Sequence, residues 1–79
     1  MKKNRKNPIA DFVRERRKYL KMTQVDLSNR AGVGLRFVRE LEQGKPTLRV
    51  DKVNEVLKLF GRELGPVILK FEFDDEDDL

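Results

Sequence analysis

The sequence contains no cysteine and no histidine. Without cysteine it forms neither disulfides nor thiolate metal sites, and without histidine the Ser/His and Cys/His catalytic pairs and histidine-ligated zinc are excluded. The longest unbroken apolar run, residues 67–69, is far too short for a membrane span or a signal-peptide core. We therefore expect a cytoplasmic protein that is not an enzyme, binds no metal or cofactor, and has no membrane partner.

A chain of 79 residues is long enough for one small domain and too short for two independent cores. Leu, Ile, Val and Phe number 25, which is enough for a folded chain. Charged residues reach 41%, against about 25% in ordinary domains, so the core is expected to be thin. Function is therefore expected on a surface rather than in a deep cleft.

The net charge of +4 conceals an uneven distribution along the chain. Five of the 14 acidic residues lie in the last six positions, so residues 1–73 contain 18 basic and 9 acidic residues, a net charge of +9. A basic excess of this size on a small domain favours a polyanionic partner, because each neutralised phosphate releases a counterion. The acidic run itself is predicted to be a disordered tail.

Helical spacing predicts a first helix over residues 8–20. Asn7 can cap it and Pro8 suits its first position. Its apolar positions are Ile9, Phe12, Val13, Tyr19 and Leu20.

Three shorter helices are predicted to follow. Thr23 and Asp26 can form a capping box that begins the second, and Gly32 is placed to end it. The third is expected over 35–43. The fourth is expected to start between 47 and 51, to end at Gly61, and to bury Val50, Val53, Val56, Leu57 and Phe60.

After Gly65 and Pro66 the apolar period changes from helical to two, which predicts a β-strand. The alternating positions are Val67, Leu69, Phe71 and Phe73. Because no other segment reads as a strand, this one has no partner in its own chain, and we expect it to pair antiparallel with a second copy. The expected organisation is a basic flexible arm over 1–7, a helical domain over 8–65, a dimerising strand over 66–73 and an acidic tail over 74–79.

The stretch from Thr23 to Gly44 resembles the helix-turn-helix of phage repressors and Xre-type regulators. Thr23 and Gln24 open the first helix of the motif, and the remaining matches are Leu27, Ala31, Gly32, Val33, Val38, Leu41, Glu42 and Gly44. The resemblance implies an all-α, lambda-repressor-like DNA-binding domain of four to five helices, here with the C-terminal β-strand pairing across a homodimer. One departure is Gly34, where the family commonly has Ser or Thr as a cap.

On a helical wheel with Val38 and Leu41 inward, the opposite face of the third helix carries Arg36, Arg39 and Glu40, with Leu35 at the flank. Together with the resemblance, this predicts base contacts from Gly34, Leu35, Arg36, Arg39 and Glu40. An arginine can grip guanine O6 and N7 together. The predicted phosphate contacts are Gln24, Gln43, Lys45 and Arg49.

Arg17 and Glu42 resemble an ion pair of the same family. That pair joins the first helix to the end of the third helix, which is the DNA-recognition helix of the family. The resemblance implies a structural role for both residues.

The C-terminal strand and the sequence from Gln43 to Leu48 look most like the HipB-type antitoxins. This implies a homodimeric repressor that binds a palindromic operator in double-stranded DNA and also holds a kinase-type toxin. Two alternatives stay open: a phage-type repressor, and an adaptor that uses the helical domain for protein contacts.

Overall fold

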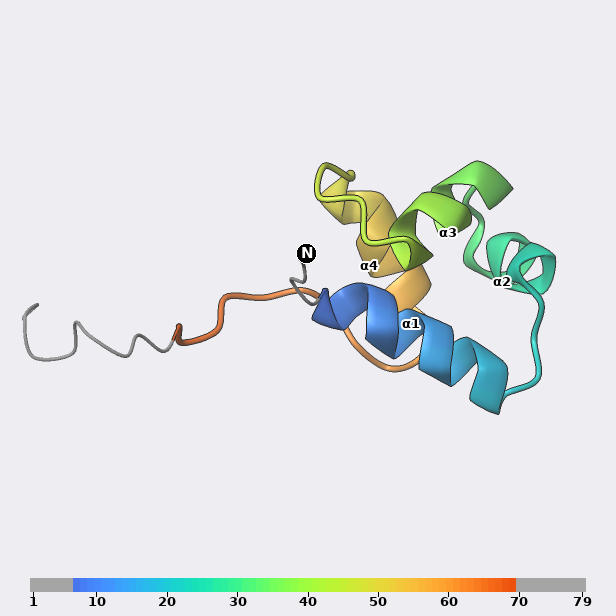
Figure 1. Cartoon of the computed structure of the whole chain (residues 1–79), viewed down its shortest axis with the longest axis horizontal. Helices are drawn as coiled ribbons and strands as arrows, with labels where there is room; N and C mark the ends of the chain where they lie inside the picture. Colours follow the sequence, from blue (N-terminus) through green and yellow to red (C-terminus); the bar gives the residue numbers. More distant parts are fainter. Residues whose placement is uncertain (1–6, 70–79) are drawn as a thin grey trace, which may run out of the picture.

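The computed structural model describes residues 7–69, and the chain forms four helices there (Figure 1). These are α1 (Pro8–Tyr19), α2 (Gln24–Ala31), α3 (Leu35–Glu42) and α4 (Val50–Lys58). No strand occurs within this range. The predicted helical architecture is thus confirmed for the described part of the chain, with four helices.

The ends of α1 follow from its sequence. The Asn7 side chain accepts a hydrogen bond from the Ala10 N–H at 3.0 Å, and Pro8 occupies the first turn, where its missing N–H costs nothing. The helix ends at Tyr19, and Lys21 adopts a positive φ of 60° in the turn that follows. The predicted start and end of this helix are confirmed.

The start and end of α2 also match the prediction. Thr23 Oγ1 accepts from the Asp26 N–H at 3.0 Å, and the Asp26 carboxylate accepts from the Thr23 N–H at 2.9 Å. The hydrogen bonds from Thr23 lower the pKa of Asp26. At the other end Gly32 has φ of 74°, a left-handed conformation that residues with a Cβ resist, and its N–H donates to the Ser28 carbonyl.

The core forms where α3 packs against both α1 and α2, and where α4 packs against α2. The largest fully buried side chains are Leu27, Val13, Val38 and Val56, so every helix contributes one. Burial of each such side chain contributes about 1.5–3 kcal/mol. Phe12 and Phe60 close one side of the core, with ring centroids 6.0 Å apart and planes at 81°.

Three of the apolar positions named above for the first and fourth helices are exposed. Val50 was expected inside, but it is 59% exposed because it begins α4 beside an open groove of about 190 Å³ that Leu41 and Leu48 also line. Tyr19 and Leu20, at the end of α1, are exposed as well. The Arg16 guanidinium stacks over the Tyr19 ring at 5.1 Å, which partly covers the ring.

The predicted strand is not found in the part of it that the structure describes. Residues 66–69 have no regular secondary structure, and their segment leads away from the four helices (Figure 1). Val67, Ile68 and Leu69 are 84%, 96% and 67% exposed. A strand needs a neighbouring strand for its backbone hydrogen bonds, and none is present within residues 7–69. Phe71 and Phe73 lie outside the described residues.

Candidate nucleic-acid interface

The helices α2 and α3 are joined by a three-residue turn, and α3 presents one face to the core and the other to solvent. Val38 is fully buried and Leu41 is 3% exposed. Arg36 and Arg39 are exposed on the outer face. The wheel predicted this orientation, because the apolar residues of so short a helix leave only one way to pack it.

The N-terminal end of α3 lies at the surface. Gly34 is its N-cap, with φ of −72° and ψ of 154°, and no side chain caps the helix there. Leu35 is half-buried beside it, whereas Phe37 packs against the core. The N–H groups of the first turn of α3 therefore receive no hydrogen bond from a capping side chain.

Glu40 connects two basic side chains on the outer face of α3. Arg36 Nε donates to Glu40 Oε2 at 3.2 Å, and Lys45 Nζ lies 3.5 Å from Glu40 Oε1. The Arg36 side chain is 89% exposed, whereas that of Glu40 is 26% exposed. The structure thus brings together three of the residues singled out in the sequence.

The remaining predicted contacts lie around this group. Arg39 and Gln43 are exposed further along α3 and at its C-cap. Among the ion pairs of residues 7–69, none involves Arg39. Arg49 is exposed at the N-cap of α4, where its pairing with Asp51 at 2.7 Å lowers the pKa of that carboxyl.

Gln24 makes a contact that the sequence did not predict. Its Nε2 donates to Glu42 Oε1 at 3.0 Å, so the side chain of the first residue of α2 is tied to the end of α3. The predicted phosphate contact from this side chain would have to coexist with that hydrogen bond. The backbone N–H groups at the start of α2 offer a second way to bind an anion.

Arg17 and Glu42 lie against each other beneath the interface. Arg17 Nε and Nη2 donate to the two Glu42 carboxylate oxygens at 2.6 Å and 2.9 Å. Burial alone raises the pKa of Glu42, but the hydrogen bonds from Arg17 and Gln24 and the charges of Arg17 and Arg14 outweigh it and leave that pKa below its ordinary value. The hydrogen bond with Glu42 raises the pKa of Arg17.

Arg14 is a further residue of this network that sequence reasoning missed. Its Nη1 donates to the Glu42 backbone carbonyl at 2.8 Å, and its Nη2 pairs with Asp11 at 2.7 Å. The first bond satisfies a carbonyl at the C-terminal end of α3, where helices leave such groups unpaired. Arg14 and Arg17 are three residues apart on α1, which places them on the same face of that helix. This spacing is the one signal in the sequence that could have indicated a shared role.

The described residues show neither a metal site nor a membrane segment. Over positions 7–69, no three acidic side chains come together in a group that could hold a metal ion. No helix of that range has the length and apolar character needed to cross a membrane.

Two helices joined by a tight turn, the second with its arginines facing outward, define a helix-turn-helix domain. The helix-turn-helix family model matches residues 13–67, and the chain belongs to this family. The chain is also similar to the uncharacterized HTH-type transcriptional regulator y4mF of Sinorhizobium fredii (strain NBRC 101917 / NGR234). The two are 46% identical over 63 residues, which cover 77% of this chain and 83% of the relative.

Proposed function

We propose that the protein is a sequence-specific DNA-binding transcriptional repressor that inserts α3 into the major groove. The observation that carries this proposal is the exposure of Arg36 and Arg39 on the face of α3 opposite Val38 and Leu41. Helix-turn-helix proteins place the second helix of the motif in that groove, with its N-terminal residues against base edges. The proposed base-reading surface consists of Gly34, Leu35, Arg36, Arg39 and Glu40.

The phosphates on either side of the groove are the proposed partners of the other exposed polar groups. Gln43 and Lys45 follow α3, and Arg49 is the N-cap of α4, so none of the three belongs to the base-reading surface defined above. The start of α2 offers backbone N–H groups beside Gln24. Such contacts fix the position of the protein on the duplex and make binding strongly dependent on salt.

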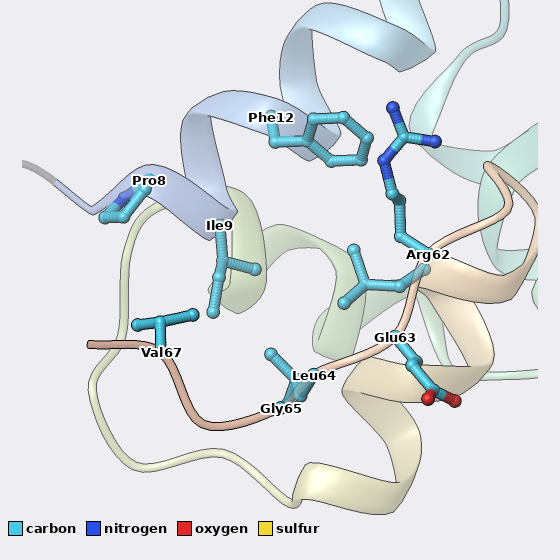
Figure 2. Close-up of a pocket in the computed structure, with 9 residues that line it drawn as sticks. Pro8, Ile9, Phe12, Arg62, Glu63, Leu64, Gly65 and Val67 are labelled. Carbon is cyan, nitrogen blue, oxygen red and sulfur yellow. The ribbon is translucent and has the colours of Figure 1, made fainter.

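The protein is further proposed to bind DNA as a homodimer through its C-terminal segment. Val67, Ile68 and Leu69 form an exposed apolar run, which a solitary chain would leave in water. Beside it a groove of about 390 Å³ lies between the start of α1 and residues 62–67 (Figure 2). Pro8, Ile9 and Phe12 line one side of this groove, so the segment and an apolar surface for a second copy adjoin each other.

A twofold dimer would read two half-sites about 34 Å apart, which is how small helix-turn-helix proteins obtain tight and specific binding. This arrangement supports a palindromic operator. A dimer bound to an operator that overlaps a promoter blocks the polymerase, so repression is the proposed outcome. Apart from Asn7, which caps α1, the predicted arm over 1–7 lies outside the described residues, as does the predicted acidic tail over 74–79.

The finer proposal is that the repressor is the autoregulating antitoxin of a kinase-type toxin. It is supported by the resemblance of residues 43–48 and of the C-terminal apolar pattern to HipB-type antitoxins. Co-expression with the product of a neighbouring kinase-sized reading frame tests it: an antitoxin forms a stable complex that removes the kinase activity. If the kinase stays active and does not bind the protein, the antitoxin proposal is wrong and the repressor proposal remains.

Binding to DNA selected from a random pool tests the main proposal. Arg36→Ala and Arg39→Ala are each expected to relax the preference at one or two base pairs, by about 1–3 kcal/mol. Lys58→Ala is the matched control, because it removes the same charge from the exposed end of α4. An adaptor would instead keep its protein partner in both arginine variants and select no duplex.

A further inference from the structure

Glu40 places a carboxylate within a surface that is otherwise basic. It lies on α3 between Arg36 and Lys45, each of which is within 3.5 Å of one of its oxygens. A negative charge facing the phosphates weakens attraction to any duplex, whatever its sequence. A role in helix stability does not account for it, since an exposed i, i+4 pair stabilises a helix only slightly and the order with the basic residue first is the weaker one.

The geometry of the pair leaves the end of the Arg36 side chain available. Glu40 Oε2 accepts from Nε of Arg36, and no other hydrogen bond or ion pair within residues 7–69 involves that guanidinium. The donors of its two Nη groups are therefore not used by any partner within residues 7–69. Recognition of guanine requires two such donors, one for O6 and one for N7.

Lys45 fixes the other side of the carboxylate. Its Nζ lies 3.5 Å from Glu40 Oε1, so both oxygens of Glu40 already face a cation. Each carboxylate oxygen can accept a second hydrogen bond, so these two cations still leave room for a contact with the N4 amino group of a cytosine. The hydrogen bond to Nε also gives Glu40 a role through Arg36, and the double variant described below separates the two roles.

We infer that Glu40 is a positioning residue, which holds Arg36 along α3 so that its two Nη groups meet one guanine in the major groove. An arginine side chain has many rotamers, and a side chain already held in place loses less conformational entropy on binding. The inference rests on the proposed DNA-binding function. It adds how that site distinguishes a guanine from the other bases. Glu40 raises discrimination and lowers affinity for unrelated duplexes.

Duplex titrations with Glu40→Ala and Glu40→Gln test this inference. The probes are the duplex selected by the wild-type protein, a set of duplexes changed at one base pair each, and a scrambled duplex. Arg36→Ala first identifies the base pair that Arg36 reads. Glu40→Ala is expected to lower discrimination at that base pair by about 3- to 10-fold, and Glu40→Gln, which keeps an oxygen that can accept from Arg36 Nε, is expected to lower it less. Neither variant is expected to bind the scrambled duplex more weakly than the wild type.

The double variant Arg36→Ala/Glu40→Ala separates a positioning role from a direct one. If Glu40 acts through Arg36, the double variant discriminates no worse than Arg36→Ala alone. Glu55→Gln is the matched control for charge, because Glu55 pairs with Lys58 on α4 at 3.6 Å. Circular dichroism of each variant checks that the fold is retained.

Two results would overturn the inference while leaving the proposed function intact. One is a loss of discrimination at a base pair other than that of Arg36, or a further loss in the double variant, because Glu40 would then read a base itself. The other is a result in which the Glu40 variants show the same base discrimination and the same affinity for the scrambled duplex as Glu55→Gln. A wild-type protein that selects no duplex at all would instead overturn the proposed function.

Discussion

Arg17 Nε lies 2.6 Å from Glu42 Oε2, although the two residues are 25 positions apart in the sequence. The pair joins the last turn of α1 to the last residue of α3, and the side chains are 11% and 4% exposed. Arg17 Nη1 also donates to the Met22 carbonyl, so the same guanidinium fixes the turn between α1 and α2. The position of the proposed recognition helix therefore depends on Arg17.

Removal of one partner of this pair is expected to destabilise the whole domain. Arg17→Met leaves the Glu42 carboxylate buried without its main cation, and breaking a buried pair in this way costs about 3–5 kcal/mol. Thermal unfolding followed by circular dichroism should show a midpoint at least ~10 °C lower. Lys18→Met, an exposed change on the same helix, is the control, and an equal effect of the two substitutions would contradict the prediction.

The acid sensitivity of the fold is expected to depend on Glu42. Because the folded-state pKa of Glu42 lies below its ordinary value, the ionised carboxylate stabilises the fold above about pH 4.3, and this contribution is lost as the pH falls through the folded-state pKa. Gln is the neutral counterpart of protonated Glu. The difference in unfolding free energy between the wild type and Glu42→Gln should therefore be constant above ~pH 5.5 and shrink below ~pH 4.

Denaturant titrations at several pH values measure this difference. Asp26 and Asp51 also have lowered pKa values, so both proteins lose stability in acid, and only the difference between them isolates Glu42. A difference that stayed the same down to pH 3 would show that the charge of Glu42 does not stabilise the fold.

Gly34 is a position where a substitution is expected to stabilise the protein. It caps α3 with no side-chain hydrogen bond, its φ of −72° suits any residue, and an added Cβ would meet no atom within 4 Å. Gly34→Ser supplies the missing acceptor and reduces the freedom of the unfolded chain. Together these should raise the unfolding free energy by about 0.5–1 kcal/mol.

Gly32→Ser is the matched contrast, because Gly32 has a positive φ of 74° and an equally open surrounding. There the same side chain is strained, and stability should fall by about 1 kcal/mol. Thermal midpoints of the two variants measured side by side check both signs. A shift in the same direction for both would show that the backbone conformation does not decide the effect.

Much of the fold could be predicted because its signals are local. The capping box of Thr23 and Asp26 and the left-handed Gly32 each depend on residues within a few positions, and the structure has both as predicted. The outward face of α3 follows from the spacing of Val38 and Leu41. Features of this kind can be predicted because all the residues that form them lie close together in the sequence.

The features that the sequence did not predict depend on distant residues. Nothing near Gln24 indicates that its amide reaches Glu42, since that contact exists only after α2 and α3 have packed. Val50 has the right spacing for burial, yet the groove beside it is open, and periodicity says nothing about what covers a face. The apolar alternation of residues 67–73 predicts a strand, but residues 67–69, the part of it that the structure describes, have no strand to pair with within residues 7–69.

The C-terminal segment gives the last prediction. Among residues 7–69 every buried core residue precedes Gly61, so a chain that ends after Pro66 keeps this core and should fold. If residues 67–73 hold the proposed dimer together, the shortened chain should be monomeric by light scattering, whereas a chain that ends after Phe73 and lacks only the acidic tail should stay dimeric. On DNA, the monomer should keep the same base preference within a half-site and lose the gain in affinity that a palindrome provides. A shortened chain that remained dimeric would place the interface on the helices instead.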